Sequence, residues 1–340
     1  MSVQPATPRP SVEDLIAGVR GGDRTLLARA ITLAESTRSG DTADATALIQ
    51  AVLPETGGAV RIGVSGVPGV GKSTFIEALG AHLTGAGHKV AVLAVDPSSS
   101  VTGGSILGDK TRMSRLACDE NAFIRPSPGG STLGGVARRT REALLLCEAG
   151  GYDVVLIETI GVGQSEIAVA GMVDVFLLLA LAGAGDELQG IKRGITEIAD
   201  VVVITKADGV NIEAAQQAAA HLKAALAMLP GPEHGDPDGH RPVMTCSAQE
   251  LTGLAEVWET LAALHSRAAT DGRLELRRNQ QSLAWMDHAL EELLRERFES
   301  HSEVAEVLPD FSRAVVAGTI DPTTAARRLL DLFLRTGEGD

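Results

Sequence analysis

The sequence has few cysteines and no apolar run long enough to cross a bilayer. Its three cysteines, Cys118, Cys147 and Cys246, lie far apart and form no C-x-x-C pair, which favours reduced thiols over a disulfide framework. The longest apolar stretch, residues 173–184, is interrupted by Asp174 and is shorter than the roughly 20 residues that a membrane-spanning helix needs. These absences argue against a disulfide-stabilised secreted domain and against an integral membrane protein.

Basic residues and a secretory leader are also lacking. Lys and Arg number 30 against 44 Asp and Glu, so the formal net charge is −14 at pH 7. An acidic chain of this kind is a poor partner for nucleic acid or for an anionic membrane. Residues 1–10 are polar and proline-rich, without the apolar h-region of a secretory signal. We therefore expect a cytoplasmic protein that uses neither nucleic acid nor a membrane as its partner.

What the sequence does contain is a glycine-rich segment with the spacing G-x-x-x-x-G-K-S of a phosphate-binding loop. An apolar run at 61–65 precedes it and a helical pattern follows, and this context argues against a chance match. Glycines let successive N–H groups curl around a polyphosphate, and the start of the next helix faces the negative charge. Lys72 would reach the β and γ phosphates, and the Ser73 hydroxyl would bind Mg²⁺. The predicted nucleotide-binding residues are Gly66, Val67, Pro68, Gly69, Val70, Gly71, Lys72, Ser73 and Thr74.

Around this loop, short β-branched runs alternate with helical patterns. Several of the runs are almost continuously apolar, as expected for parallel strands covered on both faces. The pattern predicts an α/β fold with a doubly wound, mostly parallel sheet that binds its ligand beyond the carboxyl ends of the strands. The expected strands are 61–65, 89–95, 122–125, 153–158, 173–180, 200–205 and 242–246.

The character of the sequence changes on both sides of this segment. We expect an N-terminal helical region over 1–59, a phosphate-loop domain over 60–269 and a C-terminal helical arm over 270–340. A capping box at Ser11 opens the first helix and Asp321-Pro322 opens the last. The arm contains an apolar stripe that fits either a dimer interface or an ordinary pair of helices within the chain. Its residues are Leu283, Met286, Leu290 and Leu293.

Acidic residues at strand ends suggest a metal site. Glu158 ends one apolar strand, and Gly161 follows three residues later, where its N–H could contact a γ-phosphate. Asp96 ends another strand, and Asp109 follows in a glycine- and serine-rich loop of the kind that orders around γ-phosphate and Mg²⁺. Solvated strand ends and loop-capping aspartates are the alternatives. We expect Ser73, Asp96, Asp109 and Glu158 to associate with Mg²⁺.

The four residues T-K-A-D at 205–208 match the guanine-reading motif N-K-x-D of GTPases except at Thr205. Asp208 would accept hydrogen bonds from guanine N1 and N2, a pair of donors that adenine lacks, and the Lys206 stem would lie along the purine face. A threonine can donate one hydroxyl hydrogen bond to neighbouring backbone, but it cannot supply the two-sided pairing, NH₂ donor and carbonyl acceptor, of an asparagine amide. Ser247 and Ala248, after the last strand, resemble the second guanine loop. The set predicts GTP rather than ATP.

The chain resembles a known family in further segments. The run ETIGVGQSE at 158–166 is similar to that of metallochaperone-type GTPases, which have glutamate where most GTPases have aspartate. Within that group, GAGDELQGIK at 183–192 and TLGG at 132–135 resemble the methylmalonyl-CoA mutase-associated GTPases of the MeaB/ArgK type. The similarity extends from about residue 11 to the C-terminal helices and is densest between 61 and 210.

This resemblance implies a homodimeric GTPase chaperone that uses GTP/GDP and Mg²⁺. Its partner would be an adenosylcobalamin-dependent methylmalonyl-CoA mutase or a related acyl-CoA mutase, with GTP binding and hydrolysis gating cofactor delivery and protecting the mutase. Loop 183–192 would be an additional switch whose Lys192 can turn toward the nucleotide. The catalytic group implied is Lys72, Asp109, Glu158 and Lys192.

The expected reaction is hydrolysis of GTP to GDP and phosphate, with Lys72 and the loop N–H groups stabilising the developing charge. No glutamine directly follows Gly161, and Gln164 lies three positions further on. We therefore expect slow intrinsic turnover that a partner accelerates.

Three rival interpretations remain open from the residues alone. A nickel-inserting metallochaperone GTPase would usually have His-rich or paired Cys segments, and the candidate here, 234–240, has the Gly/Pro/Asp composition of a loop. An ATP-dependent kinase is disfavoured by the T-K-A-D motif. A binding module without turnover is disfavoured by Lys72 and Ser73.

Overall fold

The computed structural model describes residues 9–95, 113–126, 133–159, 165–182, 193–229, 231, 239 and 241–336. It forms two compact units, residues 1–281 and 282–340, and helix α12 (Arg273–Glu299) contributes residues to both. The expected domain limits at 59/60 and 269/270 stay predictions.

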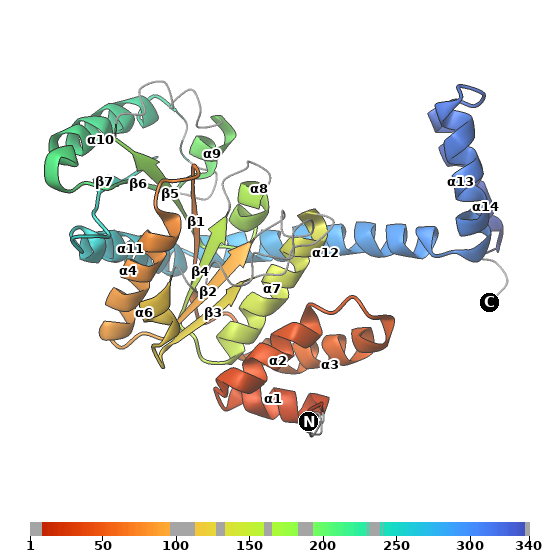
Figure 1. Cartoon of the computed structure of the whole chain (residues 1–340), viewed down its shortest axis with the longest axis horizontal. Helices are drawn as coiled ribbons and strands as arrows, with labels where there is room; N and C mark the ends of the chain where they lie inside the picture. Colours follow the sequence, from red (N-terminus) through yellow and green to blue (C-terminus); the bar gives the residue numbers. More distant parts are fainter. Residues whose placement is uncertain are drawn as a thin grey trace, which may run out of the picture. The chain divides into compact units, whose positions relative to one another are not determined.

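The first unit is built on a seven-stranded sheet of order β3-β2-β4-β1-β5-β6-β7, in which every paired strand runs parallel (Figure 1). This confirms the predicted α/β doubly wound fold, and each expected strand is present with its ends shifted by no more than two residues. The strands are β1 (Val60–Gly66), β2 (Val90–Val95), β3 (Ala122–Pro126), β4 (Val154–Thr159), β5 (Val175–Leu181), β6 (Val201–Thr205) and β7 (Val243–Thr245).

Helices cover both faces of the sheet. Ile62 and Val64 of β1 belong to a fully buried core with the apolar residues of α4 (Lys72–Gly85), α6 (Ser114–Ala117) and α11 (Leu254–Thr270). The alternate residue, Gly63, faces Val169 of α8 (Ser165–Ala170) on the opposite side. Helix α7 (Leu133–Ala149) contacts α8, β2 and β4, α9 (Arg193–Ile198) contacts β5, and α10 (Ile212–Leu226) contacts β6 and β7. Because successive strand residues point to opposite faces and helices cover both faces, the strands need apolar residues at nearly every position.

Three N-terminal helices, α1 (Val12–Arg20), α2 (Arg24–Ala34) and α3 (Thr42–Val52), pack on one another and on α7 (Figure 1). Ser11 forms the predicted capping box with Asp14, and Asp23 caps α2. Short 3₁₀ turns cover Ser39–Asp41, Leu53–Glu55 and Gly209–Asn211. Among the described residues, no helix combines the length and apolar character needed to cross a membrane.

The second unit contains the end of α12 together with α13 (Ser302–Val316) and α14 (Pro322–Thr336), and α13 packs against α14. The Phe333 ring lies edge-on to Phe298 and His301, with centroids 5.5 and 5.4 Å away. Asp321 accepts a hydrogen bond from Thr324 N at 3.0 Å, as predicted for a helix start. Helix α13 is not predicted from the sequence pattern, because it contains Pro309, a residue that removes one helical hydrogen bond.

Candidate functional site

The phosphate loop lies between β1 and α4, and its shape requires glycine. Gly66 has φ 152°, and a Cβ there would lie 2.5 Å from the Leu179 carbonyl oxygen. Gly71 has φ 97°, in the left-handed region, and it immediately precedes α4. Side chains other than glycine would strain or block this turn. The strand–loop–helix arrangement predicted from the sequence is therefore confirmed, and it directs the first N–H groups of α4 toward the loop.

Lys72, Ser73 and Glu158 lie together at this loop. The Lys72 Nζ donates hydrogen bonds to the carbonyl oxygens of Gly66 (2.7 Å) and Val67 (3.3 Å). The Ser73 hydroxyl donates to Glu158 Oε1 at 2.9 Å, across 85 residues of chain. The structure thus brings together one predicted phosphate-binding cation and two of the predicted Mg²⁺-associated oxygen groups.

A further acidic residue, Glu166 of α8, interacts electrostatically with Lys72, and no sequence motif assigns it a role. It is fully buried. Burial lowers the pKa of Lys72, and the negative charges of Glu158 and Glu166 oppose that shift. The position of Glu166 near Lys72 depends on how α8 packs, and no local sequence motif specifies that packing.

The guanine motif lies next to the phosphate loop. Thr205, 3% exposed, donates its hydroxyl to the carbonyl oxygen of Val70 at 2.7 Å. The Lys206 Nζ donates to the Gly69 carbonyl oxygen at 2.9 Å. Thr205 therefore makes the backbone hydrogen bond predicted for it, and this bond ties the end of β6 to the phosphate loop.

Asp208 and the loop after β7 form the other side of this region. The Ser247 hydroxyl donates to Asp208 Oδ2. Ser247 Oγ also accepts from Glu250 N at 3.0 Å, and the N–H of Ala207 donates to the Cys246 carbonyl oxygen at 3.0 Å. The two predicted guanine segments are thus adjacent, and the Asp208 carboxylate of one accepts a hydrogen bond from Ser247 of the other.

Several predicted site residues lie outside the described residues, and their placement stays a prediction. They are Asp96, Asp109, Gly161 and Lys192, together with Gln164 and most of the 234–240 segment. Within the described residues there is no cluster of three or more His, Cys, Asp and Glu side chains suited to a metal ion. Ser73 and Glu158 nevertheless supply adjacent oxygen atoms, the donor type that Mg²⁺ prefers.

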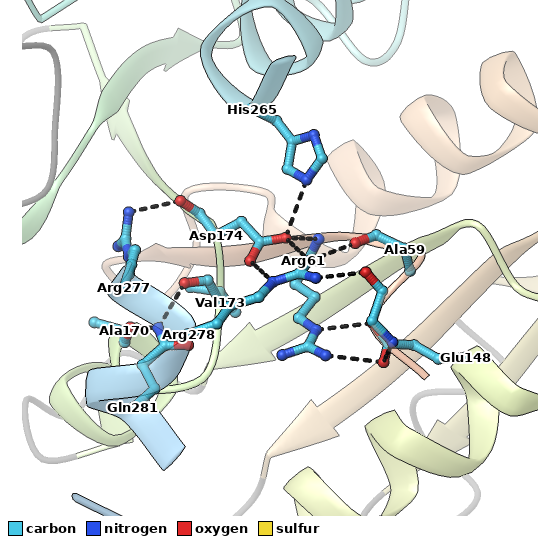
Figure 2. A network of polar contacts seen from close by, with 11 residues as sticks. Ala59, Arg61, Glu148, Ala170, Val173, Asp174, His265, Arg277, Arg278 and Gln281 are labelled. Carbon is cyan, nitrogen blue, oxygen red and sulfur yellow. Dashed lines mark hydrogen bonds and ion pairs between the residues drawn. The ribbon is translucent and has the colours of Figure 1, made fainter. Parts of the chain in front are cut away.

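A second polar cluster lies at the amino-terminal ends of β1 and β5, at the end of the strands away from the phosphate loop. Figure 2 shows its contacts. Asp174 immediately precedes β5 and is 5% exposed. Its carboxylate accepts hydrogen bonds from Arg278 Nε (2.8 Å) and Nη2 (2.7 Å) and from the backbone N–H of Arg61 (2.9 Å), while His265 Nε2 lies 3.5 Å away. Burial alone would raise the pKa of Asp174, but the contacts with His265 and Arg278 outweigh it and hold that pKa well below its usual range.

The cluster continues to α7 and along α12. The Arg61 guanidinium binds both carboxylate oxygens of Glu148, at 2.8 and 2.9 Å. Arg277 donates to the Asp174 carbonyl oxygen at 2.6 Å, and Gln281 Nε2 donates to the Val173 carbonyl oxygen at 2.8 Å (Figure 2). These contacts fasten the first part of α12 to the sheet. Strand β1 has seven residues, so it separates this cluster from the phosphate loop by about 20 Å. The cluster therefore supports the fold rather than the reaction.

Comparison with known proteins agrees with the geometry. The family model of the methylmalonyl-CoA mutase-associated GTPase MeaB matches residues 27–303. A probable GTPase of Mycobacterium tuberculosis is 51% identical over 323 residues, covering 95% of each chain. The mitochondrial methylmalonic aciduria type A homolog of Mus musculus is 47% identical over 336 residues, covering 95% of this chain and 79% of that protein.

A solved structure extends the likeness to the fold. The crystal structure titled LAO/AO transport system kinase matches with a TM-score of 0.72 and 38% identity, over 98% of this chain and 100% of that one. The structure contains the glycine loop, its lysine and the adjacent guanine segments that a GTPase needs. Membership of this GTPase family therefore also establishes the activity. The chain belongs to the MeaB family of methylmalonyl-CoA mutase-associated GTPases, and it is a GTPase that binds guanine nucleotide.

Proposed function

We propose that this GTPase is a chaperone of an adenosylcobalamin-dependent methylmalonyl-CoA mutase, or of a related acyl-CoA mutase. GTP binding and hydrolysis would gate delivery of the cofactor to the mutase and protect the mutase from inactivation. The match of the MeaB family model over residues 27–303 is the observation that supports this most strongly. The name of the Mus musculus relative, a methylmalonic aciduria type A homolog, points to the same metabolic step.

In the proposed reaction, separate roles fall on residues that the structure describes (Lys72, Ser73 and Glu158) and on residues outside the described ones (Asp96, Asp109 and Lys192). Ser73 and Glu158 would hold Mg²⁺, with Asp96 and Asp109 completing its surroundings. When bound, the ion would neutralise charge on the β and γ phosphate oxygens. Lys72 and the loop N–H groups would stabilise the charge that develops as the γ-phosphate leaves, and Lys192 would turn toward the nucleotide from the 183–192 loop.

Guanine selection is assigned to Asp208, so Asp208→Asn should weaken GDP binding by about 10- to 100-fold, because hydrogen bonds to a charged group are lost. The amide should favour xanthine, whose O2 accepts where guanine has an amino group. Competition of GDP and XDP against a fluorescent guanine nucleotide measures both effects. Glu213→Gln, an equal charge change on exposed α10, should leave the preference as it is. Unchanged GDP preference in Asp208→Asn would contradict the assignment.

We also propose that the arm forms a homodimer. In the part of α12 after residue 281, five apolar side chains are each more than half exposed, an unusual grouping for the surface of a soluble monomer. The spacing fits a helix pairing face. These residues are Leu283, Met286, Leu290, Leu293 and Leu294.

The chaperone role is tested by mixing the purified chain with a purified adenosylcobalamin-dependent methylmalonyl-CoA mutase. Size-exclusion chromatography with light scattering is run in GDP and in a non-hydrolysable GTP analogue. We expect a complex whose amount differs between the two nucleotides, a mass that contains two copies of this chain, and faster GTP turnover when mutase is added.

Asp208→Asn provides the matched control for this experiment. It should lose the response to the GTP analogue and regain it with the corresponding xanthosine analogue. A chain that hydrolyses GTP but forms no complex in either nucleotide would refute the chaperone role and leave the GTPase activity intact. Stoichiometric nickel binding in equilibrium dialysis would instead favour the metallochaperone alternative.

A further inference from the structure

A cavity of about 690 Å³ lies between the N-terminal helices and the end of β3. It is formed by the start of the described chain at Arg9 and Pro10, by α2 and the segment after it, and by Arg125 of β3. None of its lining residues belongs to the phosphate loop or to the guanine segments. Its size is within the range of about 300–1,000 Å³ typical of cavities that hold small organic molecules.

The charge of this cavity is opposite to that of the chain. Arginines outnumber acids by four to two in its lining, whereas the whole chain has a net charge of −14. An excess of positive charge in a concave site attracts anions and concentrates them locally. The charged lining residues are Arg9, Arg29, Arg38, Arg125, Glu35 and Asp41.

Two of the four arginines are paired within the cavity wall. Arg9 Nη1 lies 2.8 Å from Asp41 Oδ1, and Arg125 forms an ion pair with Glu35. The guanidinium groups of Arg29 and Arg38 have no hydrogen bond or ion pair to any residue that the structure describes. They are the groups available to a ligand.

The rest of the lining combines a fixed polar wall with an apolar floor. Ser36 Oγ donates to Asp41 Oδ2 at 2.6 Å, which holds the segment after α2 in place. Leu15 and Leu33 lie at the floor and are 2% and 4% exposed. Arg29 and Leu33 are four residues apart on α2 and therefore share one helix face. A ligand here would meet cations and apolar carbon together.

We propose that this cavity binds a small organic phosphate. Arg29 and Arg38 hold the phosphate oxygens, and the apolar part of the molecule lies on Leu15 and Leu33. A phosphate monoester has a charge of about −1.5 to −2 at neutral pH, which matches the excess of two positive charges in the lining. A carboxylate has a single charge and two oxygens, so it engages two separate guanidinium forks less completely.

The test is calorimetric titration of the full chain saturated with a non-hydrolysable GTP analogue and Mg²⁺, so that the α, β and γ phosphate positions are filled and added phosphate does not enter the phosphate loop. The probes are phenyl phosphate, inorganic phosphate and benzoate. We expect phenyl phosphate to bind at least about 10-fold more tightly than inorganic phosphate because its ring buries apolar surface. Benzoate should bind more weakly than phenyl phosphate because it lacks the second charge.

The double substitution Arg29→Ala with Arg38→Ala should weaken phenyl phosphate binding by about 10-fold or more. Both side chains are exposed, so the melting temperature should stay close to wild type. Arg327→Ala with Arg328→Ala removes the same charge from exposed positions on α14 and should leave binding unchanged. Three results would each overturn the proposal: no binding of phenyl phosphate, equal binding in both double variants, or benzoate as tight as phenyl phosphate.

Discussion

Lys72→Ala should lower the single-turnover rate of GTP hydrolysis by about 10²- to 10³-fold, the usual effect of removing one preorganised donor to transition-state charge. The Lys72 side chain is 9% exposed, and its Nζ lies over the glycine loop, 2.7 Å from the Gly66 carbonyl oxygen. In such a shielded position a cation acts on phosphate oxygens more strongly than it would in water. Phosphate release from enzyme preloaded with GTP and Mg²⁺ measures the rate.

This loss should not come from unfolding. Burial lowers the pKa of Lys72, because desolvation disfavours the charged ammonium in the folded chain. Removing the ammonium should therefore leave the melting temperature unchanged or raise it. Lys223→Ala, on the exposed surface of α10, removes the same charge and should hydrolyse GTP normally. Wild-type turnover in Lys72→Ala would exclude the proposed role of this residue.

The features predicted well from the sequence are those determined by neighbouring residues. The phosphate loop is recognisable because its glycines, Lys72 and Ser73 have a fixed spacing. The strands are recognisable because buried parallel strands are apolar throughout. Thr205 departs from the GTPase motif N-K-x-D, and its hydroxyl donates to backbone as predicted, but the acceptor, Val70, is 135 residues away and is not identified by the motif.

The features missed depend on contacts between distant residues. Arg278 and Asp174 are 104 residues apart, and arginines on a helix usually belong to its solvated face. Asp174 is visible in the sequence only as an interruption of an apolar run. Its partners follow from the packing of α12 on the strand ends, which periodicity does not specify. Glu166 is another case, because its burial beside Lys72 depends on where α8 packs.

The limits of the C-terminal helices are a third case. Pro309 favours a break, yet α13 continues through it as part of a packed pair with α14. Val304 of α13 is fully buried, and tertiary packing of this kind offsets the hydrogen bond that the proline removes. Local propensity is outweighed here by tertiary packing.

Asp174→Asn should lower the free energy of unfolding by about 3–5 kcal/mol, because the partly buried Arg278 guanidinium loses the carboxylate that balances its charge. The carboxylate accepts both Arg278 donors as well as the Arg61 N–H, and an amide places its NH₂ group against one of these donors. Total stabilities of about 5–15 kcal/mol are usual, so the loss is a large share. Urea denaturation followed by circular dichroism measures it.

The effect should depend on pH in a defined direction. The pKa of Asp174 is depressed in the folded state, whereas an unfolded aspartate has a pKa of about 3.9. The stabilisation is therefore complete above pH about 4 and is lost as the pH falls toward the folded-state pKa. The difference between wild type and Asp174→Asn should be largest near neutral pH and should shrink in acid.

A double-mutant cycle separates the buried pair from general damage. Arg278→Met should also destabilise the chain, but the double variant should lose less than the sum of the two single losses, because no uncompensated charge of that pair remains. Asp310→Asn, which breaks an exposed ion pair with Arg313 on α13, should change stability little. Strict additivity of Asp174→Asn and Arg278→Met would show that the two side chains act independently. α12 would then be held to the sheet by its other contacts, which include those of Arg277 and Gln281.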